Sequence, residues 1–213
     1  MKIRKWLSRS WRTLVIVVFC GWCLFPIYWA LSMSLKTERE AMALPPVWVF
    51  TPQFQSYVDV FTQGEFTRYF ANSLIIALST TMIALVVGIP ASYILARYPF
   101  KRSSDIDFWI LSTRMAPPVT ILIPFFVLFR SLHLIDKHVG MILVYLTISV
   151  PLVVWVMKGF FQEIPREIEE AGLVDGCSYF QAFRELIAPI AMPGMAATAI
   201  LSFLFTWNEL MFA

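Results

Sequence analysis

The sequence predicts an all-α polytopic membrane protein with five visible transmembrane helices. Hydrophobic residues make up 59% of the 213-residue chain, and the mean hydropathy is +0.70, which excludes an ordinary soluble domain. Five apolar segments each approach the roughly 20 residues that a ~30 Å hydrocarbon core requires. The loops between these segments differ in their content of Lys and Arg, as is typical of proteins that cross a bilayer several times.

The five expected spans are about Thr13–Met33, Ala71–Ala96, Ile106–Phe129, Val139–Met157 and Ala188–Trp207. The first follows a basic N-terminus, as a signal peptide would. Its apolar run of about 21 residues is longer than the usual 7–15 of a cleaved core, and no A-x-A site closes it. We therefore expect residues 1–33 to form an uncleaved anchor, residues 34–69 an irregular periplasmic loop, and residues 70–213 one membrane domain.

The distribution of basic residues predicts the orientation. Eleven of the 17 Lys and Arg residues lie in the N-terminal segment and in the loops after the second and fourth spans. Five lie in the remaining loops, and Arg114 lies within the third span. The positive-inside rule then places the N-terminus and the segment Glu163–Pro189 in the cytosol.

The segment Glu163–Pro189 is the only long polar and amphipathic part of the chain, and its pattern is typical of helix, turn and helix. Pro165 lies where a first helical turn tolerates proline. Three acidic residues then crowd the positive end of the helix dipole, namely Glu167, Glu169 and Glu170. Gly176 supplies a left-handed stop, and Ser178 with Gln181 forms a capping box that starts a second helix at once. A rigid cytosolic knob of this kind suits docking onto a partner.

This segment resembles the cytoplasmic signature loop of binding-protein-dependent ABC importer permeases, whose pattern is E-A-A, three residues, G, nine residues and I-x-L-P. The spacing is intact here, in Glu170, Ala171, Gly172, Gly176, Leu186, Ala188 and Pro189. Three positions depart from the pattern, with Gly172 for Ala, Leu186 for Ile and Ala188 for Leu. The resemblance implies the type I ABC importer transmembrane fold, with residues 159–189 as its coupling loop.

The same resemblance implies which residues couple the chain to an ATPase. These residues are Glu170, Ala171, Gly172, Asp175, Gly176 and Pro189. We expect Glu170 to face a polar or basic patch of the ATPase. Ala171 and Gly172 are expected to be small because another surface packs against them.

The implied partners are a second permease subunit, a cytosolic ABC ATPase dimer, an external solute-binding protein and the surrounding lipid, without nucleic acid. The chain has no Ser-His-Asp set, no Gly-rich phosphate loop and no G-x-x-x-x-G-K-[ST] motif, so ATP would be bound by the partner ATPase. We expect no catalytic residue, no cofactor and no metal site. The implied location is the inner membrane. Permeases of this branch have six spans, so the membrane domain is expected to be incomplete at its C-terminus.

Two further strings are similar to strings in the carbohydrate and polyol branch, which includes the maltose-type inner permease. They are T-R-M-x-P-P at Thr113–Pro118 and W-N-E at Trp207–Glu209. They indicate a sugar, polyol or related carbohydrate as the solute. The candidate pathway or gate residues are Arg114, Pro117, Pro118, Asn208 and Glu209.

Other interpretations of these residues stay open. Arg114 is also compatible with the cytosolic headgroup level, which we favour because the cost of an intramembrane charge then disappears. Asn208 and Glu209 equally fit a solvated helix end topped by an interfacial Trp. A permease for an amino acid, phosphate or peptide is the alternative within transport. A membrane-embedded enzyme using Arg114, Glu209 or the histidines is disfavoured, because no carboxylates or histidines cluster at membrane depth.

Overall fold

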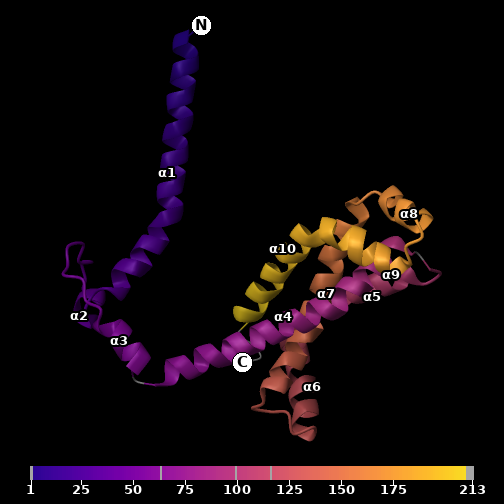
Figure 1. Cartoon of the computed structure of the whole chain (residues 1–213). Helices are drawn as coiled ribbons and strands as arrows, with labels where there is room; N and C mark the ends of the chain where they lie inside the picture. The colour runs from indigo at the N-terminus through magenta and orange to yellow at the C-terminus, as the bar shows by residue number, and fades with distance from the viewer. Residues whose placement is uncertain (1, 63, 99, 116, 210–213) are drawn as a thin grey trace. The chain divides into compact units, whose positions relative to one another are not determined.

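The computed structural model describes residues 2–62, 64–98, 100–115 and 117–209, and their regular structure is helical throughout (Figure 1). The chain divides into two compact units, Met1–Arg68 and Tyr69–Ala213. Four helices are long and apolar enough to cross a membrane, and a bent helix pair gives a fifth if it counts as one span.

The first unit contains α1 (Lys2–Ser34), α2 (Glu38–Ala41) and α3 (Gln55–Thr62). α1 carries the first expected span, and the 34–69 segment is partly helical rather than wholly irregular. A capping box starts α2, in which the Thr37 hydroxyl accepts from the backbone N–H of Glu40. The Glu40 carboxylate in turn accepts from the Thr37 hydroxyl and N–H, and these hydrogen bonds lower its pKa. The linker between α1 and α3 is therefore ordered by local capping.

Three long helices form the framework of the second unit. They are α4 (Glu65–Arg97), α7 (His138–Glu163) and α10 (Ala188–Trp207). The buried core that they form together with the segment joining α7 to α10 consists of Ala84, Tyr93, Ala96, Val153, Met157, Phe161, Ile164, Ile187 and Ala191. Hydroxyl groups join α7 to α10, because Thr198 donates to the Met157 sulfur at 3.3 Å and Ser149 lies 3.3 Å from the Thr206 oxygen. Such interhelical hydrogen bonds are common between membrane helices.

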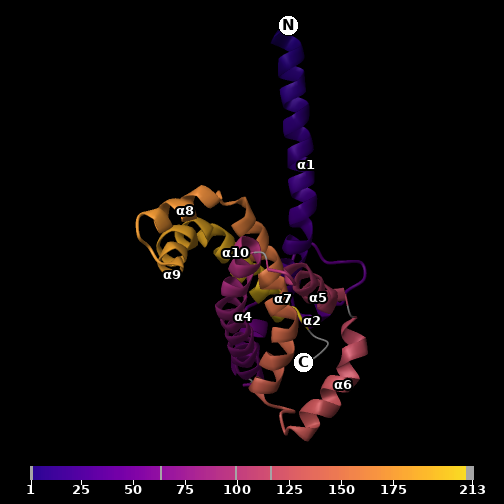
Figure 2. The ribbon, with the colours of Figure 1, turned by 90° about the vertical axis from the view of Figure 1, so that its right-hand side faces the viewer.

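The third expected span, Ile106–Phe129, is not one continuous helix. It is divided into α5 (Ser103–Met115) and α6 (Pro118–Ser131), and the two helices are bent by 95° (Figure 2). Pro117 has φ −60° and ψ 133°, which is extended backbone. The following Pro118 disfavours helical backbone at Pro117, and a proline also lacks the N–H that would continue the ladder. The proline pair thus ends one helix and begins the next, whereas Pro90 and Pro151 lie inside continuous helices.

Candidate coupling site and pathway

The polar segment between α7 and α10 folds into a compact helical cap, residues 164–187, at the end of the long helices (Figures 1 and 2). It contains α8 (Arg166–Val174), α9 (Tyr179–Gln181) and the π-helix η1 (Ala182–Ile187). η1 runs directly into α10, where Pro189 occupies the first turn. Because a proline cannot continue an α-helical ladder, a wide π turn just before it is a common adjustment.

A glycine turn separates the two halves of the cap, as the sequence predicted. Gly176 has φ +93°, a left-handed conformation that strains any residue with a Cβ. The N–H of Cys177 donates to the Gly172 carbonyl at 2.9 Å, and the N–H of Gly176 donates to the Leu173 carbonyl at 3.1 Å. This pair of bonds is the Schellman ending of a helix. It fixes the direction in which the chain leaves α8.

The expected capping box begins the second half of the cap. The Gln181 N–H donates to the Ser178 hydroxyl at 3.3 Å, and the Ser178 N–H donates to the Gln181 side-chain oxygen at 2.8 Å. Reciprocal bonds of this kind satisfy two of the free donors at a helix N-terminus. Hydrogen bonds among residues 172–181 therefore fix the turn between the two halves of the cap.

Another part of the same chain packs closely against Gly172. Its Cβ, if present, would overlap the Cδ1 atom of Leu186, and Gly172 is buried. The surface that packs against Gly172 is therefore η1 of the same chain. Ala171 beside it is exposed and stays available to a partner. The close approach of α8 to η1 makes the cap one packed body.

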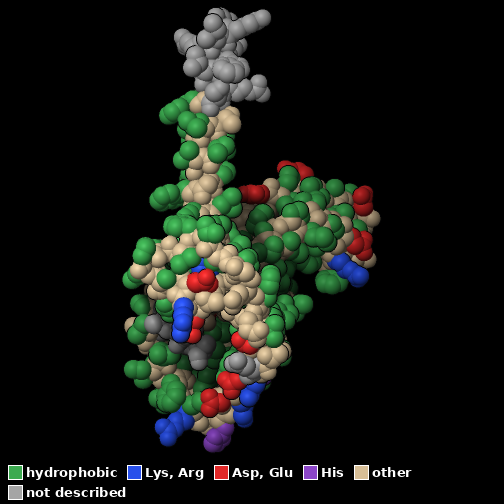
Figure 3. Space-filling view, turned by 90° about the vertical axis from the view of Figure 1, so that its left-hand side faces the viewer, with side chains coloured by type: hydrophobic (Ala, Val, Ile, Leu, Met, Phe, Trp, Pro, Cys, Tyr) green, Lys and Arg blue, Asp and Glu red, His purple; other side chains and the backbone are tan. Residues whose placement is uncertain are grey.

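The outer face of the cap is exposed and mixed in character. Glu170, Ala171 and Asp175 are exposed, and Val174 next to them has 87% of its surface accessible. Figure 3 shows acidic and basic side chains gathered at the end of the cap, over helices whose surface is mainly hydrophobic. This face therefore presents both acidic side chains and an apolar side chain to the surroundings.

Glu169, directly before Glu170, is buried and holds a polar cluster that the sequence analysis did not predict. Its carboxylate accepts hydrogen bonds from the hydroxyl groups of Tyr93, at 2.6 Å, and of Tyr98. The Nε atom of Arg97 lies 3.5 Å from the other carboxylate oxygen. Burial and the hydrogen bond to Glu169 raise the pKa of Tyr98, so its phenol stays a proton donor. The cluster joins the end of α4 to α8.

A signal for this cluster exists in the sequence. Ile168, Glu169 and Gly172 fall on one face of α8 by helical spacing, and that face points inward. A carboxylate on an inward face requires a charged or hydrogen-bonding partner. The spacing does not reveal that the partner comes from residues 93–98.

The candidate pathway residues lie closer together than their sequence positions indicate. The guanidinium of Arg114, at the end of α5, lies 5.8 Å from the centre of the Phe205 ring in α10. Phe205 is 17 residues after Ala188, which corresponds to roughly 26 Å of helix beyond the cap. The Arg114 side chain therefore lies beside the half of α10 that is farther from the cap, and its depth in the bilayer stays a prediction.

Asn208 and Glu209 end the same helix. Asn208 is the C-cap of α10, and its amide donates to the Leu204 carbonyl at 2.8 Å. The Tyr145 hydroxyl of α7 donates to the backbone carbonyl of Glu209 at 3.3 Å. This hydrogen bond connects the end of the W-N-E string to α7. Phe205, which contacts Arg114, lies about one helical turn before Asn208 and Glu209. Pro117 follows Arg114 at the bend between α5 and α6.

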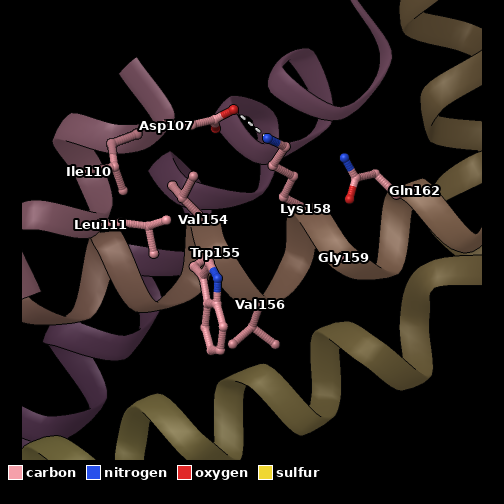
Figure 4. A pocket seen from close by; sticks show the side chains of 9 residues that line it. All are labelled: Asp107, Ile110, Leu111, Val154, Trp155, Val156, Lys158, Gly159 and Gln162. Atoms are coloured by element: carbon pink, nitrogen blue, oxygen red, sulfur yellow. Dashed lines mark hydrogen bonds and ion pairs between the residues drawn. The ribbon is translucent and has the colours of Figure 1, made fainter. Parts of the chain in front are cut away.

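A second polar feature lies between α5 and α7, nearer to the cap. Asp107 and Lys158 point toward each other and form an ion pair at the edge of a pocket of about 450 Å³ (Figure 4). The pocket wall also includes Leu111, Trp155 and Gln162. The pair anchors the first turns of α5 to the end of α7 that leads into the cap. Among the described residues, no group of three or more His, Cys, Asp and Glu side chains is arranged to hold a metal ion.

Comparison with known protein families identifies this arrangement. Residues 88–213 match the family described as the binding-protein-dependent transport system inner membrane component. The chain belongs to this family. The match covers the cap, the α5–α6 bend and α10, which are the parts described above. The chain is accordingly a multi-pass inner-membrane permease subunit of an ABC importer. It works with an ATPase, which is a separate subunit, and with a solute-binding protein.

Several individual proteins are similar to this permease over most of its length. The trehalose transport system permease protein SugB of Mycobacterium tuberculosis is 37% identical over 196 residues, covering 91% of this chain and 70% of that protein. The diacetylchitobiose uptake system permease protein DasC of Streptomyces coelicolor is 30% identical, covering 97% and 75%. The trehalose/maltose transport system permease protein MalG of Thermococcus litoralis is 28% identical, covering 90% and 69%.

A solved structure has the same fold. A chain of a bacterial ABC transporter involved in the import of the acidic polysaccharide alginate superimposes with a TM-score of 0.75. It is 23% identical, and the match covers 95% of this permease and 71% of that chain. The all-helical importer fold expected from the sequence is confirmed.

Proposed function

We propose that this permease forms, with a second permease subunit, the membrane pathway of an importer for a sugar, polyol or related carbohydrate. Its N-terminus and its cap lie in the cytosol, where the cap docks onto an ABC ATPase dimer. ATP-driven closure of the ATPases moves the cap as a body, and the attached helices switch access to the pathway. The coupling is mechanical and involves no covalent step in this chain.

The exposed edge of the cap is the observation that carries the proposal. Glu170, Ala171 and Val174 face outward, while Glu169 and Gly172 of the same helix face inward. The helix therefore offers one acidic and one apolar contact to a partner, and the Schellman turn at Gly176 holds that edge in place. Glu170, Asp175 and Gly176 are the docking residues in this proposal, and Pro189 begins the helix that carries the movement onward.

The relatives support the carbohydrate assignment. Proteins named for trehalose, diacetylchitobiose and trehalose/maltose transport are 28–37% identical to this chain over most of its length. Within the chain, the Arg114 guanidinium lies beside the Phe205 ring, and Trp207, Asn208 and Glu209 follow Phe205 within about one helical turn. Aromatic faces with amide and carboxylate groups suit a polyhydroxylated solute. The alternative solutes are amino acids, phosphate and peptides.

The docking part is tested with cysteine crosslinking of the assembled transporter. Cysteines placed at Glu170 and Asp175 should crosslink to the ATPase, whereas a cysteine at exposed Gln162, before the cap, should not. Glu170→Lys should weaken co-purification of the ATPase, and an acidic substitution on the ATPase should partly restore it. Absence of any crosslink between residues 170 and 176 would contradict docking through the cap.

The solute part is tested on the binding protein that stimulates ATP hydrolysis by the purified transporter. We expect it to bind trehalose, maltose or diacetylchitobiose in isothermal titration calorimetry. Binding of an amino acid, inorganic phosphate or a peptide with none of the sugars would show that the importer serves another solute class. That result would leave the docking of the cap unaffected.

A further inference from the structure

The cap has a direct polar connection to a helix that does not enter it. The chain enters the cap from α7 and leaves it into α10, so these two helices must follow any movement of the cap. α4 ends at Arg97, more than 60 residues before the cap. The polar contact between the end of α4 and the cap involves four residues, which we call the α4 latch: Tyr93, Arg97, Tyr98 and Glu169.

The α4 latch is built around one shared carboxylate. Glu169 receives two tyrosine hydroxyl groups and lies beside the Arg97 guanidinium, and the side chains of Arg97 and Glu169 are 3% and 8% exposed. Aromatic rings close the surroundings, since the Tyr93 ring lies 4.6 Å from that of Phe183 in η1. Two tyrosine hydroxyl groups and one guanidinium, all from residues 93–98, therefore converge on a single side chain of α8.

A buried ion pair is a poor choice for stability alone. Removing two charges from water is expensive, and apolar residues of similar size are often as stabilising or more so. A satisfied polar network specifies one position of α4 relative to α8, because its hydrogen bonds and charges are met in one geometry. Apolar contacts alone would allow the two helices to slide. The chemistry at this position thus favours a role in positioning.

The Arg97 guanidinium also has buried N–H groups that make no hydrogen bond within the described part of the chain. Its Nε and Nη2 atoms are buried without a hydrogen-bond partner among the described residues. Both belong to a side chain that lines a pocket of about 240 Å³ together with Arg166, Glu170 and Leu173. One pocket is thus lined both by Arg97 of α4 and by Glu170 on the exposed edge of the cap.

We propose that Arg97 and Glu169 are positioning residues that lock α4 to the cap, so that movement of the cap is transmitted to α4 as well as to α7 and α10. α4 has 33 residues and so extends roughly 50 Å, long enough to carry the movement across the bilayer. The proposal rests on the proposed function, in which the ATPase moves the cap. Arg97 and Glu169 act through the cap and contact neither solute nor ATP.

The test compares two ways of removing the α4 latch in the complete transporter. Glu169→Gln keeps the shape but leaves the Arg97 charge unpaired. The triple variant Tyr93→Phe, Arg97→Met and Glu169→Met removes the charges together with the buried hydroxyl, so that the site can pack as an apolar contact. Tyr98 is 36% exposed, so its hydroxyl can turn to water in both variants.

We expect both variants to co-purify with the ATPase and to hydrolyse ATP at the basal wild-type rate. The stimulation of hydrolysis by the binding protein should fall about fivefold or more, as expected for loss of a coupling interaction. The matched control is Glu167→Gln, which alters an exposed carboxylate of the same helix and should retain full stimulation.

Full stimulation in the assembled triple variant would overturn the proposal, because packing alone would then suffice. If Glu169→Gln does not assemble, the triple variant alone decides the question. The crosslinks at positions 170 and 175 separate this proposal from the proposed function. Crosslinks with unchanged stimulation refute the α4 latch only, whereas missing crosslinks refute docking of the cap.

Discussion

At the scale of single residues, two adjacent carboxylates have opposite environments. Glu169 is buried between two tyrosines and an arginine, and Glu170 is exposed on the outer edge of the cap. Successive residues of an α-helix point about 100° apart, which suffices to turn one inward and the next outward. The acidic pair therefore serves two purposes, holding α8 to α4 and presenting a charge to the outside.

Residues whose roles depend on local backbone were predictable from sequence. Gly176 and the Ser178–Gln181 capping box act within four residues of themselves, so their spacing is enough to assign them. The environments of Glu169 and Gly172 are set by contacts with Tyr93 and Leu186. The sequence pattern does not indicate which distant side chains make these contacts. The roles of Glu169 and Gly172 required the tertiary structure.

The contact between Gly172 and Leu186 gives a prediction at this scale. Gly172→Val should destabilise the permease by about 1–3 kcal/mol, because the new side chain overlaps Leu186 in a packed interface. The thermal unfolding midpoint of the purified protein measures the effect. Combining it with Leu186→Ala should recover part of the loss, since the smaller side chain makes room.

The matched control for that prediction is Gly159→Val in α7, where an added Cβ meets no atom within 4 Å. Its unfolding midpoint should not fall as that of Gly172→Val does, because valine at 159 meets no neighbouring atom and has a helix propensity no lower than that of glycine. Equal losses in the two variants would show that the α8–η1 contact does not determine the size of residue 172.

At the scale of elements, hydropathy predicted where the apolar helices lie in the sequence but not where a helix breaks and its axis turns. Four expected spans correspond to continuous helices, α1, α4, α7 and α10. The third expected span is two helices joined at Pro117 and Pro118. The bend was not predicted, because a hydropathy window averages over the residues on both sides of it. The π-helix η1 was also not predicted, since its residues have ordinary helical character and only the following Pro189 disturbs the ladder.

The bend between α5 and α6 should depend on its two prolines. In the variant Pro117→Ala and Pro118→Ala, both residues can take up helical backbone, so the two helices should join. Spin labels at Phe108 and Ile123, both largely exposed, report the change through their separation. The separation should increase toward the roughly 22 Å expected for 15 residues of continuous helix.

The control for the bend is Pro124→Ala, which alters a proline inside α6 rather than at the junction. The label separation should then stay at its wild-type value. An unchanged separation in the double variant would mean that tertiary packing, and not proline, holds the 95° bend.

At the scale of the whole molecule, contacts within the second unit agree with the distribution of charge. The α4 latch brings the end of α4 to the cap, and the Asp107–Lys158 pair brings the start of α5 to the same end of α7. The loop joining α4 to α5, which holds Lys101 and Arg102, therefore lies at the cap end. The loop that leads into α7, with Lys137, lies at the other end of α7. Lys101 and Arg102 thus lie on the same side as Arg166 and Arg184 of the cap, which is the side that the positive-inside rule predicts to be cytosolic.

This arrangement predicts which positions a membrane-impermeant thiol reagent reaches in intact spheroplasts. Four positions are exposed and lie in loops or at helix starts, namely Gln53, Lys137, Arg102 and Arg166. Each is replaced by cysteine in a background without Cys20, Cys23 and Cys177. Cysteines at 53 and 137 should be modified, and those at 102 and 166 should be protected until the membrane is permeabilised. Labelling at all four after permeabilisation shows that protection reflects the membrane and not burial. The inverse pattern would place the cap outside the cell, where no ATPase could dock onto it.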